Sequence, residues 1–387
     1  MYKIQTLNAI SQKGLSRLPA DRYAVSNDAA DADAILVRSF KLHDYPFSDN
    51  LLAVARAGSG TNNVPVKALS DRGIVVFNSP GANSNAVKEL VLAGMLIGCR
   101  NIGPAIDFVR GLEGTDAEMA VAVESGKKKF AGFELPGRTL GVVGLGAIGV
   151  KIANAARGLG MNVIGYDPTI TIERAWQLDS DVEAAPNIDA LLAQSDFITF
   201  HVPLIDSTRN LINADSLQKL KDGVVLLNFA RNGILDDSAV LAGLESGKVY
   251  AYVCDFPSNE LRTNPRVVTL PHLGASTREA EENCAIMVAD QVRDYLENGN
   301  ICNSVNLPNV KLRRTGLARI ALVNQNHPDM LGKISHVLGQ ASVNIAHMMN
   351  DSKGNMAYTL MDVDSPVTNA TLADLAAIPG VLKVRLL

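Results

Sequence analysis

Val143-Gly144-Leu145-Gly146-Ala147-Ile148-Gly149 follows a short apolar run that begins at Thr139 and contains the pattern Gly-x-Gly-x-x-Gly. Where this pattern joins a strand to a helix, the first glycine permits a tight turn and the second lets a pyrophosphate approach the backbone. The third allows close packing of helix on strand. The N–H groups that open the helix then face the phosphates. The stretch predicts a dinucleotide site made by Gly144, Gly146, Ala147, Ile148 and Gly149.

Downstream of this stretch, short apolar runs alternate with helix-like segments. The runs that we expect to be strands are 140–143, 162–166, 197–200, 224–227 and 250–253. Such alternation requires right-handed crossovers, which build a parallel, doubly wound sheet. The sequence therefore predicts a Rossmann-like α/β domain. Two long helix-like stretches, Ala86 to Val109 and Arg278 to Leu296, would connect it to a second α/β domain.

Asp167 ends the next predicted strand, about 20 residues beyond the first glycine, where a carboxylate accepts hydrogen bonds from the ribose hydroxyls. The same charge would repel a 2′-phosphate, so NAD is favoured over NADP as the cofactor. The alternative is that Asp167 is only a turn or cap residue before Pro168.

We expect three domains from the pattern of apolar runs. Residues 1–95, completed by 281–306, are predicted to form a flavodoxin-like α/β domain that binds substrate, and 96–280 the NAD-binding domain. Residues 307–316 are interpreted as a linker. Residues 317–387 show the order βαββαβ, which is typical of a small α+β domain with an antiparallel sheet.

Three polar or charged residues are candidates for catalysis. Arg231 and His272 each follow a predicted strand, and the carboxyl ends of parallel strands are where doubly wound sheets bind ligands. A guanidinium holds a carboxylate with two hydrogen bonds, and an imidazole takes the proton released when a hydride leaves an alcohol. Glu260 would orient the imidazole and stabilise its charged form. Each of the three, taken alone, has a structural alternative such as a surface ion pair.

Composition excludes several classes of function. The chain has 387 residues, a net charge of −4 and a pI of about 5.9, which argues against nucleic acid or an anionic membrane as partner. Four dispersed cysteines and six histidines without metal-ligand spacing predict neither disulfides nor a metal site, and fit a reducing cytoplasm. Lys127, Lys128 and Lys129 form a basic cluster, which is either a solvated loop or a contact for an anionic substrate.

Several of these motifs together resemble the D-isomer-specific 2-hydroxyacid dehydrogenase family over about residues 1–306. The matching segments are 139–149, Tyr166-Asp167-Pro168, His201-Val202-Pro203-Leu204 with Thr208, 228–236, 255–260 and 271–280. The resemblance implies that Arg231, Glu260 and His272 are the catalytic set and that the first domain closes over the substrate as a lid. Asn232 stands where the family usually has glycine, and the segment 255–260 departs from the usual spelling.

The resemblance also implies ligand-binding roles. The residues implied to contact NAD, beyond the glycine loop and Asp167, are His201, Val202, Pro203, Thr208, Ala230, Arg231, Asp255 and His272, with Asp255 holding the nicotinamide carboxamide. The residues implied to contact substrate are Arg38, Arg56, Ser59, Gly60, Asn78, Arg231 and His272. Backbone N–H groups of 58–60 would hold the substrate carboxylate.

The C-terminal segment resembles an ACT regulatory domain, a combination that within this family implies oxidation of 3-phosphoglycerate to 3-phosphohydroxypyruvate, the first step of serine synthesis. The substrate phosphate needs cations, and Arg38 and Arg56, at predicted strand ends, are better placed for it than the lysine cluster. The resemblance implies an L-serine effector at Asn324, Asn326 and Asn344, or else a domain that only makes a dimer contact. Homo-oligomers, dimeric or tetrameric, are expected.

Two rival functions remain open at the level of sequence. One is another dehydrogenase of the family, acting on glyoxylate, hydroxypyruvate, D-lactate or phosphoerythronate. The other is a non-enzymatic NAD-sensing regulator, because a fold does not by itself imply a function.

Overall fold

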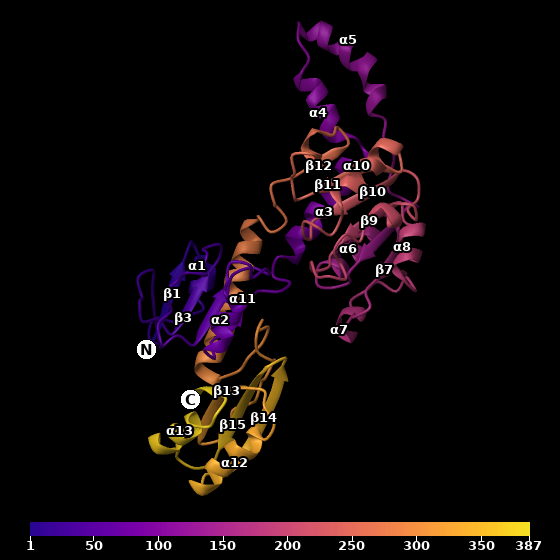
Figure 1. Cartoon of the computed structure of the whole chain (residues 1–387). Coiled ribbons are helices and arrows are strands. Elements are labelled where there is room, and N and C mark those ends of the chain that lie inside the picture. Colours follow the sequence, from indigo (N-terminus) through magenta and orange to yellow (C-terminus); the bar gives the residue numbers. More distant parts are fainter. The chain divides into compact units, whose positions relative to one another are not determined.

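The computed structural model describes all residues, Met1 to Leu387, and divides the chain into two compact units. The first unit consists of Met1–Asn83 and Arg278–Leu387, and the second of Ser84–Thr277. The first unit thus contains both ends of the chain, which Figure 1 colours indigo and yellow.

The second unit is built on a seven-stranded sheet with the order β12-β11-β10-β9-β6-β7-β8, in which every pairing is parallel. Its strands are β6 (Thr139–Val143), β7 (Asn162–Tyr166), β8 (Val182–Ala184), β9 (Phe197–Phe200), β10 (Val224–Asn228), β11 (Val249–Cys254) and β12 (Val267–Thr269). The strand order reverses between β6 and β9, which is the place where doubly wound sheets bind ligands. The predicted Rossmann-like sheet is confirmed.

Helices cover both faces of this sheet. They are α3 (Ser84–Cys99), α6 (Gly149–Gly158), α8 (Ile188–Gln194), α9 (Ala214–Leu217) and α10 (Asp237–Ser246). The short helix α7 (Ile172–Ala175) buries no side chain, and a 3-10 turn, η2, lies at Leu261–Thr263. Apolar side chains of α3 and α6 pack with one face of the sheet, and those of α8, α9 and α10 with the other. Two separate apolar layers therefore hold the sheet, as the continuous apolar strands require.

The predicted long helix from Ala86 to Val109 is in fact two helices. α3 ends at Cys99, Asn101 adopts a left-handed backbone with φ 53°, and α4 (Ile102–Arg110) starts in a new direction. With α5 (Asp116–Gly126) and the 3-10 turn η1 (Lys127–Phe130), α4 forms an arm that extends away from the sheet of its own unit (Figure 1). No single helix has the length and apolar composition to cross a bilayer, although the bent pair α3 and α4 meets both conditions jointly.

The first unit begins with a five-stranded parallel sheet of order β2-β1-β3-β4-β5, the flavodoxin-like order. Its strands are β1 (Tyr2–Leu7), β2 (Tyr23–Ser26), β3 (Ala34–Val37), β4 (Ala53–Arg56) and β5 (Val75–Phe77). Its helices are α1 (Gln12–Leu15), α2 (Val66–Asp71) and the long α11 (Arg278–Asn298). Because α11 packs on β3, β4 and β5, the last third of the chain completes this domain.

The remaining residues form an antiparallel sheet of order β14-β15-β13-β16. The elements are β13 (Ala318–Gln325), α12 (Met330–Gln340), β14 (Ile345–Lys353), β15 (Met356–Val363), α13 (Asn369–Ala376) and β16 (Val381–Leu386). The predicted βαββαβ order and antiparallel sheet are therefore found, a topology compatible with an ACT domain. One face of the sheet packs on α12 and α13.

The other face of this C-terminal sheet packs against the flavodoxin-like domain within the first unit. Tyr358 and Leu360 on β15 share an apolar cluster with Tyr295 and Leu296 near the end of α11. Residues 307–316, interpreted from sequence as a linker, supply buried Leu307 and Val310 to that cluster. The second unit also starts at Ser84 rather than at residue 96, because α3 packs on β10 and β11.

Candidate active site

The glycine loop after β6 has the space that a pyrophosphate needs. A Cβ on Gly144, which has φ +93°, would lie 2.7 Å from the carbonyl oxygen of His201, and a Cβ on Gly149 would lie 1.9 Å from that of Gly144. A Cβ on Gly146 would meet no atom within 4 Å. Two glycines are thus required for close packing, whereas Gly146 faces open space, as expected if ligand atoms approach the backbone there.

Asp167 braces this loop. Its Oδ2 accepts a hydrogen bond from the backbone N–H of Leu145 at 2.9 Å, and its Oδ1 accepts bonds from the N–H and hydroxyl of Thr169 at 2.9 and 3.0 Å. Oδ1 thus accepts two hydrogen bonds, whereas Oδ2 accepts one and retains a lone pair for a further donor. Asp167 is therefore attached to the glycine loop and is able to accept ribose hydroxyls from the same position.

His201 lies at the end of β9, across the strand-order reversal from the glycine loop. Its Nε2 is 2.8 Å from the hydroxyl of Thr199, and its Nδ1 is buried without a hydrogen-bond partner. Burial lowers the pKa of His201 from 6.5 to about 3. The ring is therefore neutral at physiological pH, and its unpartnered nitrogen fits a site that gains a ligand. Further along the same loop, Thr208 donates its hydroxyl to the Pro203 carbonyl at 2.5 Å.

Arg231 is exposed on the loop that follows β10. Its guanidinium Nη1 donates to the carbonyl of Ala230 at 2.6 Å. The side chain of the buried Asn228 holds this loop, since its Oδ1 accepts from the N–H of Ala230 at 3.2 Å and its Nδ2 donates to the carbonyl of Arg231 at 2.9 Å.

His272 is exposed on the loop after β12, with a left-handed backbone at φ 55°. Its ring meets that of Phe256 edge-on, with centroids 5.2 Å apart. Glu260, also exposed, starts the η2 turn and makes no hydrogen bond to the imidazole. The negative charge of Glu260 acts on Asp237 instead. The pKa of the Asp237 carboxyl is raised mainly by burial and to a smaller extent by that charge. The predicted Glu260–His272 contact stays a prediction.

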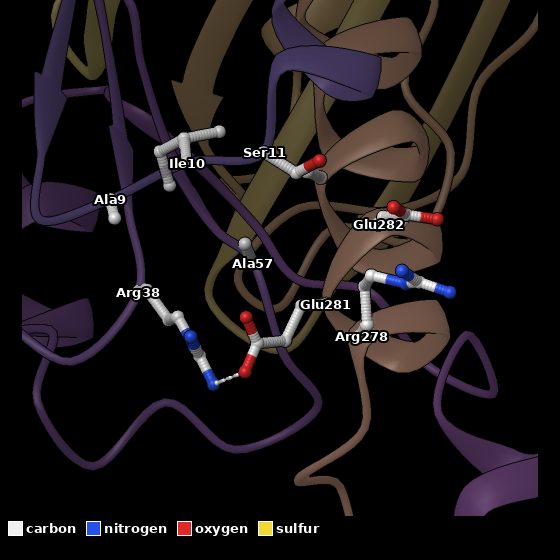
Figure 2. Close-up of a pocket in the computed structure, with 9 residues that line it drawn as sticks. Ala9, Ile10, Ser11, Arg38, Ala57, Arg278, Glu281 and Glu282 are labelled. Atoms are coloured by element: carbon white, nitrogen blue, oxygen red, sulfur yellow. Dashed lines mark hydrogen bonds and ion pairs between the residues drawn. The ribbon is translucent and has the colours of Figure 1, made fainter.

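In the first unit, the cations predicted to bind substrate lie at the ends of β3 and β4. Arg38 donates from Nη2 to the Glu281 carboxylate at 2.5 Å across a cavity of about 240 Å³ (Figure 2). Arg278 and Glu282, near the start of α11, also line that cavity. Arg56 donates from Nε to the carbonyl of Arg38 at 3.1 Å.

The predicted loop residues of the first unit are joined by hydrogen bonds. Asn78 donates from Nδ2 to the Ser59 carbonyl at 2.6 Å, and the Ser59 hydroxyl donates to Oδ1 of Asn83 at 3.1 Å. A Cβ on Gly58, at φ +154°, would lie 1.7 Å from Nη1 of Arg56. The turn 58–60 therefore lies directly beside the Arg56 guanidinium.

The predicted effector residues bond to different segments of the C-terminal domain. Asn324 donates to the Gln325 carbonyl at 2.8 Å, while its buried Oδ1 has no partner. Asn326 donates to the Gly354 carbonyl at 3.3 Å, and Asn344 to the Asp364 carboxylate at 2.6 Å. In the second unit, Lys127 of the basic cluster pairs with Glu124 on the arm at 2.5 Å.

Two features of these sites were missed by sequence reasoning. Glu281, the partner of Arg38, is 243 positions away in sequence, so no local pattern indicates the pair. Asn228 was read only as part of a family-like segment, although a polar residue that ends an otherwise apolar strand is a signal for a loop-bracing side chain. No group of three or more His, Cys, Asp or Glu side chains is arranged to hold a metal ion.

The chain is similar in sequence to known proteins. The model of the D-isomer specific 2-hydroxyacid dehydrogenase NAD binding domain matches residues 100–274. A D-3-phosphoglycerate dehydrogenase from Haemophilus influenzae is 34% identical over 349 residues, covering 87% of this chain and 81% of the relative. The chain belongs to the D-isomer specific 2-hydroxyacid dehydrogenase family. The predicted NAD-binding domain is thereby confirmed, and the glycine loop described above fits that cofactor.

The relatives differ in how much of their own length matches this chain. A D-3-phosphoglycerate dehydrogenase from Methanocaldococcus jannaschii is 36% identical over 324 residues, covering 81% of this chain but only 59% of the relative. The NAD+-bound structure of 3-phosphoglycerate dehydrogenase from Entamoeba histolytica aligns with a TM-score of 0.61 at 25% identity, covering 79% of this chain and 98% of that one. The chain thus spans little more than half of the archaeal relative.

Proposed function

We propose that this protein oxidises 3-phosphoglycerate to 3-phosphohydroxypyruvate with NAD, the first step of L-serine synthesis. The observation that carries the proposal is the placement of Arg231 and His272 on loops at the carboxyl ends of β10 and β12, the same sheet edge that carries the glycine loop. The names of the Haemophilus and Methanocaldococcus relatives supply the substrate.

The residues of the second unit have distinct roles in this proposal. NAD, when bound, supplies the acceptor for the hydride that leaves C2 of the substrate. Arg231 binds the substrate carboxylate through its paired N–H groups. His272 removes the hydroxyl proton, and Glu260 stabilises the imidazolium that results. The glycine loop, Asp167 and the 201–208 loop hold the cofactor.

The substrate phosphate is assigned to the first unit. Arg38 and Arg56 supply guanidinium groups, which bind phosphate oxygens in pairs, and Asn78 orders the Ser59–Gly60 turn. Binding of phosphate to Arg38 would compete with its ion pair to Glu281. Arg38→Ala and Arg56→Ala should each raise KM for 3-phosphoglycerate by roughly 10-fold or more, the worth of a charge-assisted hydrogen bond, with the NADH dissociation constant unchanged. An unchanged KM in both variants would refute the assignment.

A steady-state assay tests the function directly. Purified protein should reduce NAD with 3-phosphoglycerate faster than with D-lactate, glycolate or 4-phosphoerythronate. His272→Ala should lower kcat by about 100-fold or more, because a positioned acid or base contributes roughly that much. No turnover by the wild type, or a near wild-type kcat in the variant, would count against the proposal. His43→Ala, at an exposed histidine of the first unit, is the matched control.

The C-terminal domain is proposed to be an ACT domain that binds L-serine at Asn324, Asn326 and Asn344. Support comes from its βαββαβ topology and from the buried, unpartnered Oδ1 of Asn324, since a buried acceptor without a donor costs free energy that a ligand recovers. The same assay, repeated with millimolar L-serine, should show inhibition that Asn344→Ala removes.

We further propose a homo-oligomer in which the arms of two chains pair. α4 buries none of its side chains within the unit, and its apolar Ile102, Ile106 and Val109 are 38%, 44% and 53% exposed. With Arg100, Ala105 and Arg110 they line a groove of about 450 Å³. An apolar helix without a core beneath it is stabilised when a second copy covers it.

A further inference from the structure

Two buried polar residues at the ends of adjacent strands hold the loops of Arg231 and His272. Asn228 is the last residue of β10 and lies in register with Cys254, the last residue of β11, which Asp255 follows. Asn228 is 2% exposed and Asp255 is 1% exposed. The N–H of Asp255 donates to the carbonyl of Asn228 at 3.1 Å. The two residues are thus joined directly beneath the two loops.

Each residue of this pair has the hydrogen-bonding groups that the backbone of its loop requires. Asn228 faces one backbone donor, on Ala230, and one backbone acceptor, on Arg231, and an amide satisfies both. Asp255 faces two donors, the N–H groups of Leu273 at 2.8 Å and Gly274 at 2.7 Å, and a carboxylate satisfies both. Exchanging amide and carboxylate at either position would set like groups against each other without changing side-chain volume.

The backbone of His272 needs such support. A left-handed φ of 55° is unfavourable for a residue other than glycine, and it persists only where the surroundings impose it. The N–H of His272 donates to the carbonyl of Asp255 at 3.2 Å, so Asp255 binds three consecutive residues of this loop.

We infer that Asn228 and Asp255 form one bracket that fixes the relative positions of Arg231 and His272, and that both are positioning residues for the hydride-transfer reaction. The inference rests on the proposed function. It differs from the cofactor contact that the family resemblance implies for Asp255, because the bracket acts through hydrogen bonds to the backbone of the His272 loop.

Isosteric variants test the bracket. Asn228→Asp should raise KM for 3-phosphoglycerate, since Arg231 is displaced, while the NADH dissociation constant from fluorescence stays unchanged. Asp255→Asn should lower kcat by about 100-fold, the effect of a displacement of roughly 1 Å at a reacting group. It should also move the limb of the pH–rate profile that reports His272. Asp222→Asn, an exposed carboxylate before β10 that pairs with Lys248, is the matched control.

Amide hydrogen exchange followed by NMR gives a second readout that does not require turnover. In the wild type, the amides of Leu273 and Gly274 should exchange far more slowly than that of Ala275 in the same exposed loop, and Asp255→Asn should remove this protection. Fast exchange at both amides in the wild type would overturn the bracket, as would wild-type kcat, KM and pH profile in both variants. Failure of the proposed function would appear instead as an inactive wild type with protected amides.

Discussion

At the scale of single residues, His201 makes stability depend on pH. Its pKa is near 3 in the folded protein and about 6.5 in the unfolded chain, so the unfolded chain binds the proton first as pH falls. The unfolding free energy is therefore not reduced by His201 above about pH 6.5. As pH falls from there toward about 3, it decreases by up to ~1.4 kcal/mol per pH unit.

We therefore expect His201→Gln to reduce the acid sensitivity of the second unit. Urea unfolding between pH 7 and 4 should show a steeper loss of unfolding free energy for the wild type than for His201→Gln, by up to ~1.4 kcal/mol per pH unit. Glutamine retains a hydrogen-bonding group for Thr199 but does not titrate. His43→Gln, at an exposed position, should leave the slope as in the wild type. If the unfolding free energy changed with pH equally in all three proteins, His201 would be solvated.

At the scale of elements, the end of α11 is capped by side chains of the C-terminal domain. Arg385 donates to the carbonyls of Tyr295 at 3.1 Å and Leu296 at 2.8 Å, and Tyr358 donates to that of Gly299 at 2.6 Å. Arg319, in a fully buried ion pair with Asp362, donates to the carbonyl of Asn298 at 2.8 Å. The last carbonyls of a helix need such donors, and cations are favoured at that end by the helix dipole.

This capping makes Arg385 a stabilising residue of the flavodoxin-like domain. Arg385→Ala removes two charge-assisted bonds and a cation over the Tyr295 ring, and should lower the unfolding free energy of the first unit by about 2–4 kcal/mol. Chemical denaturation measures the effect. Arg385→Lys should have an intermediate effect, because lysine retains the charge but lacks the fork of donors. Arg313→Ala, at an exposed arginine of the same unit, should have almost none.

The pattern of apolar residues predicted strands of the sheet but missed a short edge strand and a break between two helices. The runs 162–166 and 197–200 coincide with β7 and β9, because buried parallel strands are continuous apolar runs. The short edge strand β8 was missed, since Val182 is its only aliphatic residue longer than alanine. The break at Asn101 was missed because one left-handed residue leaves the apolar pattern of α3 and α4 unchanged.

In the candidate sites, likewise, a motif of consecutive residues was predicted and contacts between distant residues were not. The glycine loop was predicted because the cofactor imposes its spacing on consecutive residues. The packing of the C-terminal sheet on α11 was not predicted, since Tyr358 and Arg385 meet carbonyl groups that are 59 to 90 positions away in sequence. Backbone carbonyls carry no sequence signal, so bonds to them are visible only in the folded chain.

At the scale of the whole molecule, the C-terminal sheet of the first unit and the arm of the second differ in how their side chains are packed. The C-terminal sheet packs on the flavodoxin-like domain within the first unit, whereas α4 in the arm of the second unit has no buried side chain. A charge placed in the apolar groove of α4 would therefore act on association and leave folding of the monomer nearly unchanged, because these positions are already exposed.

Ile106→Glu tests the proposed pairing of arms. Light scattering at micromolar concentration should give at least a dimer for the wild type and a monomer for this variant, with unchanged circular dichroism. Burying an unpaired carboxylate in an apolar contact costs several kcal/mol, so about a thousandfold weaker dimerisation is expected. Ile172→Glu, at a residue of the same unit that is 75% exposed on α7, should remain associated like the wild type. A monomeric wild type, or association retained by Ile106→Glu, would exclude the arm as the interface.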